Sequence, residues 1–294
     1  MALSASGATR VRLDYRPPLA TGALFGFLAA RAIPGVEVVN GHEYRRAVLG
    51  RSGDTVLRLR PARGPASEVE LEIGSAEPDE LDRLVSAARR LLDLDVDPLV
   101  IDAALARDPV LRPLVAASPG RRVPGAFDGF ASTVLAILAQ GVTLASARTL
   151  AGRIARRHGR PVDLGDPAID RRFPEPAVLA EADLADVGLT GRRAATIRAL
   201  AGAVADGRLD LDPSADHRPA LEALSTIPGI GPWTTAYVAL RVFGDRDACP
   251  PGDAAVRAAF RRLGLPADPA SIAARAEAWR PWRGYAIVHL WSTG

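Results

Sequence analysis

The sequence predicts an α+β protein, with an N-terminal antiparallel sheet carrying packed helices and two all-helical lobes after it. Two observations lead to this fold class. Strand-like alternation lies in the first hundred residues, whereas the chain beyond about residue 95 has helical spacing interrupted by Gly- and Pro-rich turns. Elements that segregate along a chain in this way favour α+β packing. We therefore expect a mixed domain over residues 1–97 and a helical region over residues 98–294.

The elements of the N-terminal domain follow from periodicity. Glu68–Ile73 alternates strictly between charged and apolar residues, which indicates a strand with one buried face. Thr55–Arg60 and Val36–Val39 are further strand candidates. Pro78–Leu94 has apolar residues at helical spacing, and Leu24–Ile33 is a short apolar helix.

Periodicity and turn residues also divide the helical region. We expect a central helical domain over 127–245 and a second helical domain formed by 98–126 plus 246–294. A Pro-, Asp- and Arg-rich stretch over 161–176 is a predicted loop. The expected helices after this stretch lie at 176–188, 192–207, 216–225, 233–243, 253–263, 271–279 and 282–291.

Composition excludes several kinds of chemistry. All 37 basic side chains are arginines, so no lysine Schiff base can form. The single Cys249 excludes an internal disulfide and an iron–sulfur cluster held by four thiolates of this chain. The four His residues show no zinc-ligand spacing. No apolar run reaches the length of a membrane span, and the N-terminus does not read as a signal peptide, so we expect a cytoplasmic protein with no membrane partner.

Charge is distributed unevenly along the chain. The net charge is +3, but the segment from Glu68 to Asp108 holds twelve acids and four arginines, a balance of −8 that leaves +11 for the remainder. A basic body with one acidic region suits an anionic partner such as nucleic acid. Solvated surfaces also carry such runs, so the charge pattern does not identify the partner by itself.

The stretch IPGIGPWTTAY, residues 227–237, places a tight turn between two expected helices. Gly229 and Gly231 allow unusual backbone angles and put no side chain in the way. Successive N–H groups at the start of the next helix can then point outward together and hold an anion such as a DNA phosphate. Thr234 could add its hydroxyl. A plain helix–helix turn is the alternative interpretation.

Several segments resemble a known family. The run LSTIPGIGPWTTAYVALRVFG at residues 224–244, followed by CPPGDAAV at 249–256, resembles the helix–hairpin–helix and Gly/Pro-Asp signature of base-excision DNA glycosylases. More narrowly it is similar to the DNA-3-methyladenine glycosylase II family. LFGFLAARA at 24–32, the segment 120–145 and EAWRPWRGYAIVHLW at 277–291 extend the resemblance over nearly the whole chain. It implies a TATA-binding-protein-like N-terminal lobe and an active-site cleft between the helical lobes.

The resemblance implies that Asp253 is the catalytic carboxylate. Asp253 follows a Pro-Pro-Gly corner at an expected helix start, where it also suits an N-cap, and the two roles are compatible. A carboxylate at a helix N-terminus stays ionised. It would stabilise the oxocarbenium ion that develops as the N-glycosidic bond breaks, and it could orient or deprotonate the attacking water.

Four aromatic residues are the expected base-binding side chains. Trp291 and Phe27 match pocket residues of the family, and Trp233 and Tyr237 lie on one face of the helix after the turn. Electron-rich rings stack on a flipped base and favour one that carries positive charge. Core packing is the alternative for each ring, and it weighs most for Phe27 and Trp233. Trp279 and Trp282 are expected to be packing residues only.

The implied function is a monofunctional DNA glycosylase that excises alkylated purines of the 3-methyladenine type from double-stranded DNA and leaves an abasic site. Relatives that also cleave the strand use a lysine just after the second Gly of the hairpin, where this chain has Trp233 and no lysine anywhere. We expect a monomer. A non-catalytic DNA-binding or lesion-sensing protein, and a glycosylase for deaminated or oxidised bases, remain alternatives.

Two features depart from the family pattern. The family inserts a bulky apolar residue into the gap left by the flipped base, and the matching position here is Gly141. Gln140, Val142 or Leu144 would have to take over this role, or flipping would be confined to weakened pairs. The chain also ends three residues after Trp291, earlier than the family usually does. A natural end, a shortened chain and the glycosylase half of a larger adaptive-response protein all fit this ending.

Backbone groups of the hairpin could serve a second purpose. By resemblance, the carbonyls of Ile227 and Ile230 could hold a monovalent cation, which would add positive charge where a phosphate docks. No other cofactor is required. Arg283 and the pair Arg192–Arg193 are candidate contacts to the DNA backbone, although solvated arginines are an equal alternative.

Overall fold

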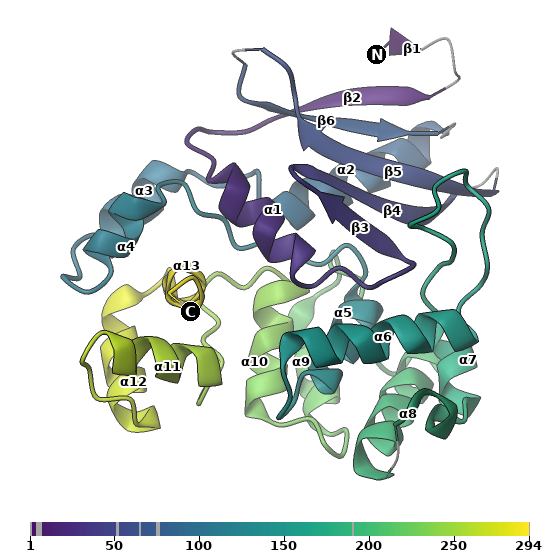
Figure 1. Ribbon diagram of the computed structural model, residues 1–294. Coiled ribbons are helices and arrows are strands. Elements are labelled where there is room, and N and C mark those ends of the chain that lie inside the picture. The colour runs from purple at the N-terminus through teal and green to yellow at the C-terminus, as the bar shows by residue number, and fades with distance from the viewer. Residues whose placement is uncertain are drawn as a thin grey trace.

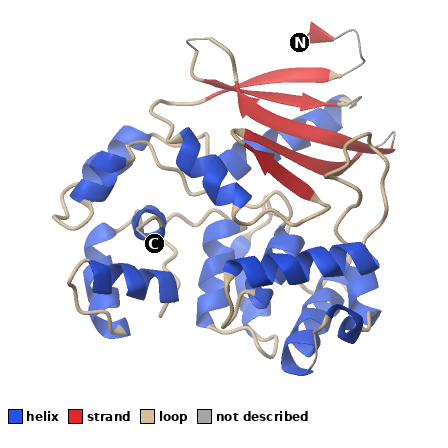
Figure 2. Ribbon diagram, in the orientation of Figure 1, coloured by secondary structure: helices blue, strands red, loops and turns tan. Residues whose placement is uncertain are grey.

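The computed structural model describes residues 2–3, 8–50, 53–64, 66–74, 77–189 and 191–293. The strands gather at one end of the molecule and most of the helices lie below them (Figures 1 and 2). The predicted α+β class is therefore confirmed. In the described part of the chain, no helix is long and apolar enough to cross a membrane.

The N-terminal part contains a six-stranded antiparallel sheet with the order β1-β2-β6-β5-β4-β3. Its strands are β1 (Ala2–Leu3), β2 (Thr9–Asp14), β3 (Glu37–Asn40), β4 (Glu43–Gly50), β5 (Gly53–Pro61) and β6 (Glu68–Ile73). The three strands expected from sequence form at β3, β5 and β6. Strands β1, β2 and β4 were not expected from the sequence, and the Arg-rich alternation of β2 and β4 becomes clear only beside their partner strands.

One face of the sheet is covered by α1 (Thr21–Ala29) and α2 (Pro78–Leu92). The apolar residues of β6 alternate inward and are fully buried, as their spacing predicts. Leu24, Phe25 and Leu28 of α1 pack into the same core. This packing positions the remaining face of α1, with Phe27, toward the helical lobes (Figure 1).

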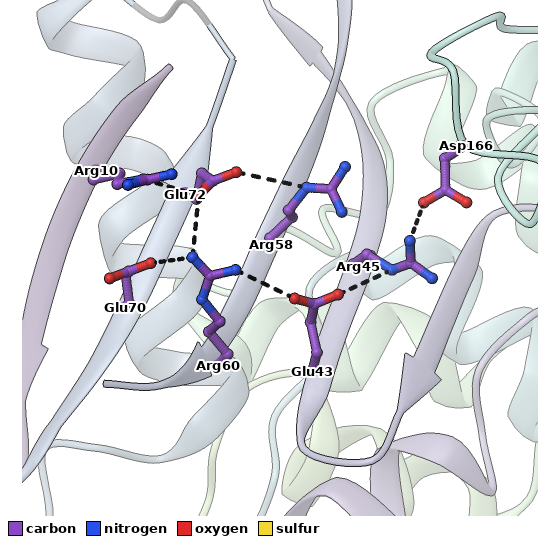
Figure 3. Close-up of polar contacts among 8 residues, drawn as sticks. All are labelled: Arg10, Glu43, Arg45, Arg58, Arg60, Glu70, Glu72 and Asp166. Carbon is purple, nitrogen blue, oxygen red and sulfur yellow. Dashed lines mark hydrogen bonds and ion pairs between the residues drawn. The ribbon is translucent and has the colours of Figure 1, made fainter. Parts of the chain in front are cut away.

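The opposite face of the sheet carries a ladder of alternating charges (Figure 3). Glu72 lies 2.9 Å from Arg10 and 3.3 Å from Arg60, and Arg60 also pairs with Glu70. The ladder continues across the neighbouring strands through Glu43, Arg45 and Asp166. Four arginines and four acids are drawn in this network, so it is balanced in charge and is not a basic patch for a polyanion.

The helical part is built from short helices joined by tight turns. In chain order these are α3 (Pro98–Leu105), α4 (Arg112–Ala117), α5 (Gly129–Leu138), α6 (Leu144–His158), α7 (Pro176–Glu181), η1 (Leu184–Val187), α8 (Gly191–Ala205), α9 (His217–Ser225), α10 (Pro232–Arg241), α11 (Ala254–Arg262), α12 (Pro269–Ala276), η2 (Glu277–Trp279) and α13 (Arg283–Trp291). Each expected helix forms, although the one expected at 176–188 divides into α7 and the 3₁₀ turn η1, and the one expected at 271–279 divides into α12 and the 3₁₀ turn η2.

Two apolar clusters hold these helices together. One is formed mainly by α5 to α10, and the other by α3, α4 and α11 to α13. Helix α10 contributes to both, because Val238 belongs to the first cluster while Ala239 and Leu240 belong to the second. Helix α10 therefore lies where the two groups of helices meet.

Candidate active site

The turn between α9 and α10 is a compact hairpin set by Gly229. Its φ of +93° lies in the left-handed region, and a Cβ at this position would stand 2.1 Å from the Oγ1 of Thr196. The same hydroxyl donates to the carbonyl of Pro228 at 2.8 Å, which joins the turn to α8. No side chain can therefore be added to Gly229 without moving α8.

Two backbone amides of this hairpin have no hydrogen-bond partner in the described part of the chain. Gly231 is the N-cap of α10 and Pro232 opens the helix, so the first helical turn begins with unpaired amides. The amides of Gly229 and Gly231 donate no hydrogen bond within the described residues, and Gly229 is exposed. This arrangement can accept an anion, with the positive end of the helix dipole behind it.

Thr234 lies differently from the expectation that its hydroxyl faces a phosphate. The residue is 2% exposed, and its Oγ1 accepts a hydrogen bond from the Nε2 of Gln140 at 2.9 Å. The same Nε2 donates to the carbonyl of Gly229 at 3.1 Å. The threonine hydroxyl therefore connects the α5–α6 loop to the hairpin. Because the residue is buried, this hydroxyl does not lie on the outer surface.

Asp253 is held by three N–H donors. Its Oδ1 accepts from the amide of Val256 at 2.9 Å, which makes it the N-cap of α11. The indole of Trp291 donates to the same oxygen at 3.0 Å, and the indole of Trp233 donates to Oδ2 at 2.8 Å. The residue is 7% exposed, and it forms no ion pair with any described arginine. The carboxylate is therefore held in one orientation, and its negative charge is not neutralised by an ion pair with these residues.

The aromatic residues line one cleft with Asp253. The cleft has a volume of about 1400 Å³ and is bordered by all four expected base-binding rings, which come from α1, α10 and α13. Trp233 and Tyr237 stack at a centroid distance of 5.2 Å, Phe27 and Trp291 stack at 6.0 Å, and Tyr237 lies 6.1 Å from Trp291. The cleft is large enough to admit a nucleobase.

Two arginines beside these rings were not identified from the sequence. Arg31 lies over the ring of Phe27 with its guanidinium carbon 3.5 Å from the ring centroid, and it lines the cleft. Arg241 is 4% exposed and approaches Phe27 from further in, at 4.5 Å. Arg31 follows Phe27 by four residues and Arg241 follows Tyr237 by four, so helical spacing was the available signal.

The loop after α5 leaves Val142 as the exposed apolar side chain at its tip. Gly141 has a φ of +69° and open space around it, and the side chain of Gln140 is bonded to the hairpin. Val142 is 40% exposed, and Leu144 is half-buried in the first turn of α6.

Two of the arginines considered for DNA contacts have other partners. Arg283 pairs with Asp247 at 2.8 Å and with Glu277 at 3.0 Å, so its charge is already neutralised. Arg193 donates to the carbonyl of Gln140 at 2.6 Å, which braces the loop beside the hairpin. The carbonyl of Ile227 accepts the amide of Ile230 inside the turn and retains one lone pair.

Two regions of the chain match known protein families. Residues 10–128 match the AlkA N-terminal domain, and residues 134–284 match the HhH-GPD superfamily base excision DNA repair protein family. The chain is 36% identical to DNA-3-methyladenine glycosylase 2 of Escherichia coli, with 96% of each chain covered.

A second relative is much longer than this chain. The chain is 39% identical to a probable bifunctional transcriptional activator/DNA repair enzyme AlkA of Mycobacterium tuberculosis, covering 99% of this chain but only 58% of that protein. Among solved structures, a 3-methyladenine DNA-glycosylase from Archaeoglobus fulgidus has the same fold at a TM-score of 0.80 and 21% identity, covering 96% of this chain and 97% of that one. On these matches, the chain belongs to the HhH-GPD superfamily of base excision DNA repair proteins.

Proposed function

We propose that this protein is a monofunctional DNA glycosylase that flips a damaged purine out of double-stranded DNA and hydrolyses its N-glycosidic bond. One observation carries the proposal. Asp253 forms part of the wall of an aromatic cleft, held by two indole N–H groups and a helix amide, and no arginine of the described residues is paired with it. The names of the E. coli and A. fulgidus relatives support 3-methyladenine-type purines as the lesion class.

Binding would use backbone rather than side-chain contacts at the hairpin. The amides of Gly229 and Gly231, which have no partner among the described residues, suit a DNA phosphate, and the carbonyls of Ile227 and Ile230 would supply oxygen ligands if a monovalent cation binds there. Val142 would fill the gap left by the flipped nucleotide, because Gly141 has no side chain and Gln140 is bonded to the hairpin. We take the protein to act as a monomer.

Catalysis would follow from charge placement. As the bond between the sugar and the base breaks, positive charge develops on the sugar, and an ionised carboxylate nearby stabilises it. The three donors leave lone pairs of Asp253 free, so the same group could also accept a proton from the attacking water. Without a lysine beside the cleft no Schiff base forms on the sugar, so the product would be an intact abasic strand.

The test is release of free base from methylated duplex DNA by the wild type and by Asp253→Asn. We expect the wild type to release 3-methyladenine and to leave abasic sites without strand breaks. The Asn variant should bind DNA with unchanged affinity and release little base. DNA binding by both proteins with base release by neither would instead establish a non-catalytic DNA-binding protein.

A further inference from the structure

Arg31 places a positive charge in a cleft whose rings are expected to bind positively charged bases. Its guanidinium lies 3.5 Å above the ring of Phe27 and 5.6 Å from the ring of Trp291. A cation over an aromatic face uses the same negative ring potential that would otherwise attract a cationic base. The faces expected to favour positive charge are therefore already shared with a positive side chain.

Tyr237 holds this guanidinium in place. The Nε of Arg31 donates to the hydroxyl of Tyr237 at 3.3 Å, and Arg241 donates to the same oxygen at 3.3 Å. Burial by itself raises the pKa of Tyr237, but the two neighbouring arginines outweigh burial and lower it. Arg241 in turn donates to the carbonyls of Pro124 and Gly125, and these bonds fix its position beside Tyr237 and Arg31.

The charged residues that line the cleft carry more positive than negative charge. Among the described lining residues, Arg31 and Arg121 are cationic and Asp253 is the one acid. Asp253 is bonded to Trp233 and Trp291, whereas Arg31 is bonded to Tyr237 and stacked on Phe27. The carboxylate is thus bonded to the two indoles, and the guanidinium lies on Phe27 and Tyr237 in the same cleft.

Neither stacked pair of rings leaves room for a base between its two members. A planar base between two rings needs about 7 Å, which is two contact distances of about 3.5 Å. The stacked pairs have centroids 5.2 and 6.0 Å apart. A base in the cleft would therefore lie beside these stacked pairs and not within them, in the cleft that Arg31 also lines.

We propose that Arg31 extends excision to neutral purines that carry acceptor atoms, because it assists their departure and gives no such assistance to formally cationic purines. This inference rests on the proposed glycosylase function and deepens it. When a neutral purine leaves, the bond between C1′ and N9 breaks with its electron pair on the base, and water supplies the new C1′–O bond and releases a proton. The departing base is anionic until it takes up a proton. A guanidinium stabilises that charge through charge-assisted hydrogen bonds.

A formally cationic purine gains less from this residue. It becomes neutral when the electron pair arrives, so it needs no donor, and before cleavage its charge is repelled by Arg31. Removing the guanidinium should therefore slow release of neutral purines and leave release of cationic purines unchanged or faster. A purely structural role for Arg31 would slow both to the same degree.

The experiment measures single-turnover release of hypoxanthine and of 7-methylguanine from otherwise identical duplexes, with the enzyme in excess. Hypoxanthine is neutral with an O6 acceptor, and 7-methylguanine is formally cationic in DNA. We expect Arg31→Gln to lower the hypoxanthine-to-7-methylguanine rate ratio at least about tenfold, which is a barrier difference of ~1.4 kcal/mol. Comparing ratios between variant and wild type cancels the different costs of flipping the two bases.

Three further variants make the result specific. Arg31→Lys keeps the charge and should restore part of the ratio. Arg121→Gln removes a cation that lines the same cleft without a ring contact, and it should move the ratio less than Arg31→Gln does. Arg208→Gln removes a cation whose side chain is 67% exposed and paired with Asp206, and it should leave both rates unchanged.

Each outcome separates the inference from the proposed function. Equal slowing of both bases by Arg31→Gln, or an equal shift with Arg121→Gln, would overturn the role of Arg31 while leaving the glycosylase proposal intact. Failure of the wild type to release either base would remove the proposed function itself. Thermal unfolding of Arg31→Gln identifies a folding defect, and Arg31→Lys then provides the test.

Discussion

Asp253 is buried and Asp108 is half-buried, and the two carboxylates have nearly the same donors but different surroundings. Asp108, between α3 and α4, accepts from the amide of Val110 at 2.7 Å and from the indole of Trp279 at 2.8 Å. Asp253 likewise accepts one amide and two indoles. The difference is Arg275, which pairs with Asp108 at 2.8 Å, whereas Asp253 has no such partner in the described part of the chain.

This difference separates a structural carboxylate from one available for chemistry. At Asp108 the guanidinium neutralises the charge, and the group joins α12 and η2 to the α3–α4 turn. At Asp253 neutral donors orient the carboxylate without cancelling its charge, and the group borders an open cleft. An unneutralised buried charge is costly, and it persists at sites where it interacts with developing positive charge.

The largest expected effect is that the same Asp→Asn substitution lowers the rate of base release at Asp253 but lowers stability at Asp108. Asp253→Asn should lower the rate of base release by about 10²–10⁴-fold, the range typical of losing a catalytic group. Its unfolding free energy should change by less than about 1 kcal/mol, because Asn is as good an N-cap as Asp. Single-turnover kinetics and urea denaturation measure the two quantities.

Asp108→Asn should give the opposite pair of results. We expect a loss of about 1–3 kcal/mol in unfolding free energy, because a hydrogen-bonded partner of Arg275 is removed, with near-normal base release. Equal catalytic losses in both variants would show that the comparison between the two sites fails.

A smaller effect is expected from removing single indole N–H groups. Trp291→Phe should slow base release about tenfold or more, since the carboxylate loses one orienting donor and one ring changes size. Trp279→Phe removes the matching donor from Asp108, and it should lower stability by about 1 kcal/mol without slowing catalysis. If Trp291→Phe released base at the wild-type rate, indole orientation of Asp253 would be unnecessary.

The smallest effect concerns acid stability. Burial alone raises the pKa of Asp108, but hydrogen bonds from Arg275, Trp279 and Val110 outweigh it, and the resulting pKa is below the usual value. A carboxylate with a lowered folded-state pKa stabilises the fold above its unfolded pKa of about 3.9, and that stabilisation is lost as pH falls further. Urea midpoints between pH 5 and 3 should therefore fall less steeply for Asp108→Asn than for the wild type, and parallel curves would contradict the assignment.

Much of the fold could be predicted from local pattern. The alternation of Glu68–Ile73 and the helical spacing of Pro78–Leu94 correspond to β6 and α2, because burial of one face requires that period. The strand β4 was missed, since its inward and outward residues are distinguished by its neighbours β3 and β5. The hairpin, and Asp253 at the start of a helix, were also predicted from short motifs.

What the sequence by itself determined was the order of elements, the Gly turn at the hairpin, the absence of lysine, and the identity of an acid at a helix start. Only the tertiary structure decided that two indoles from different helices bond to Asp253 and that Arg31 covers Phe27. Thr234 also faces inward for a tertiary reason. Side-chain direction depends on which helices pack together, and residues far apart in the chain meet only after that packing is complete.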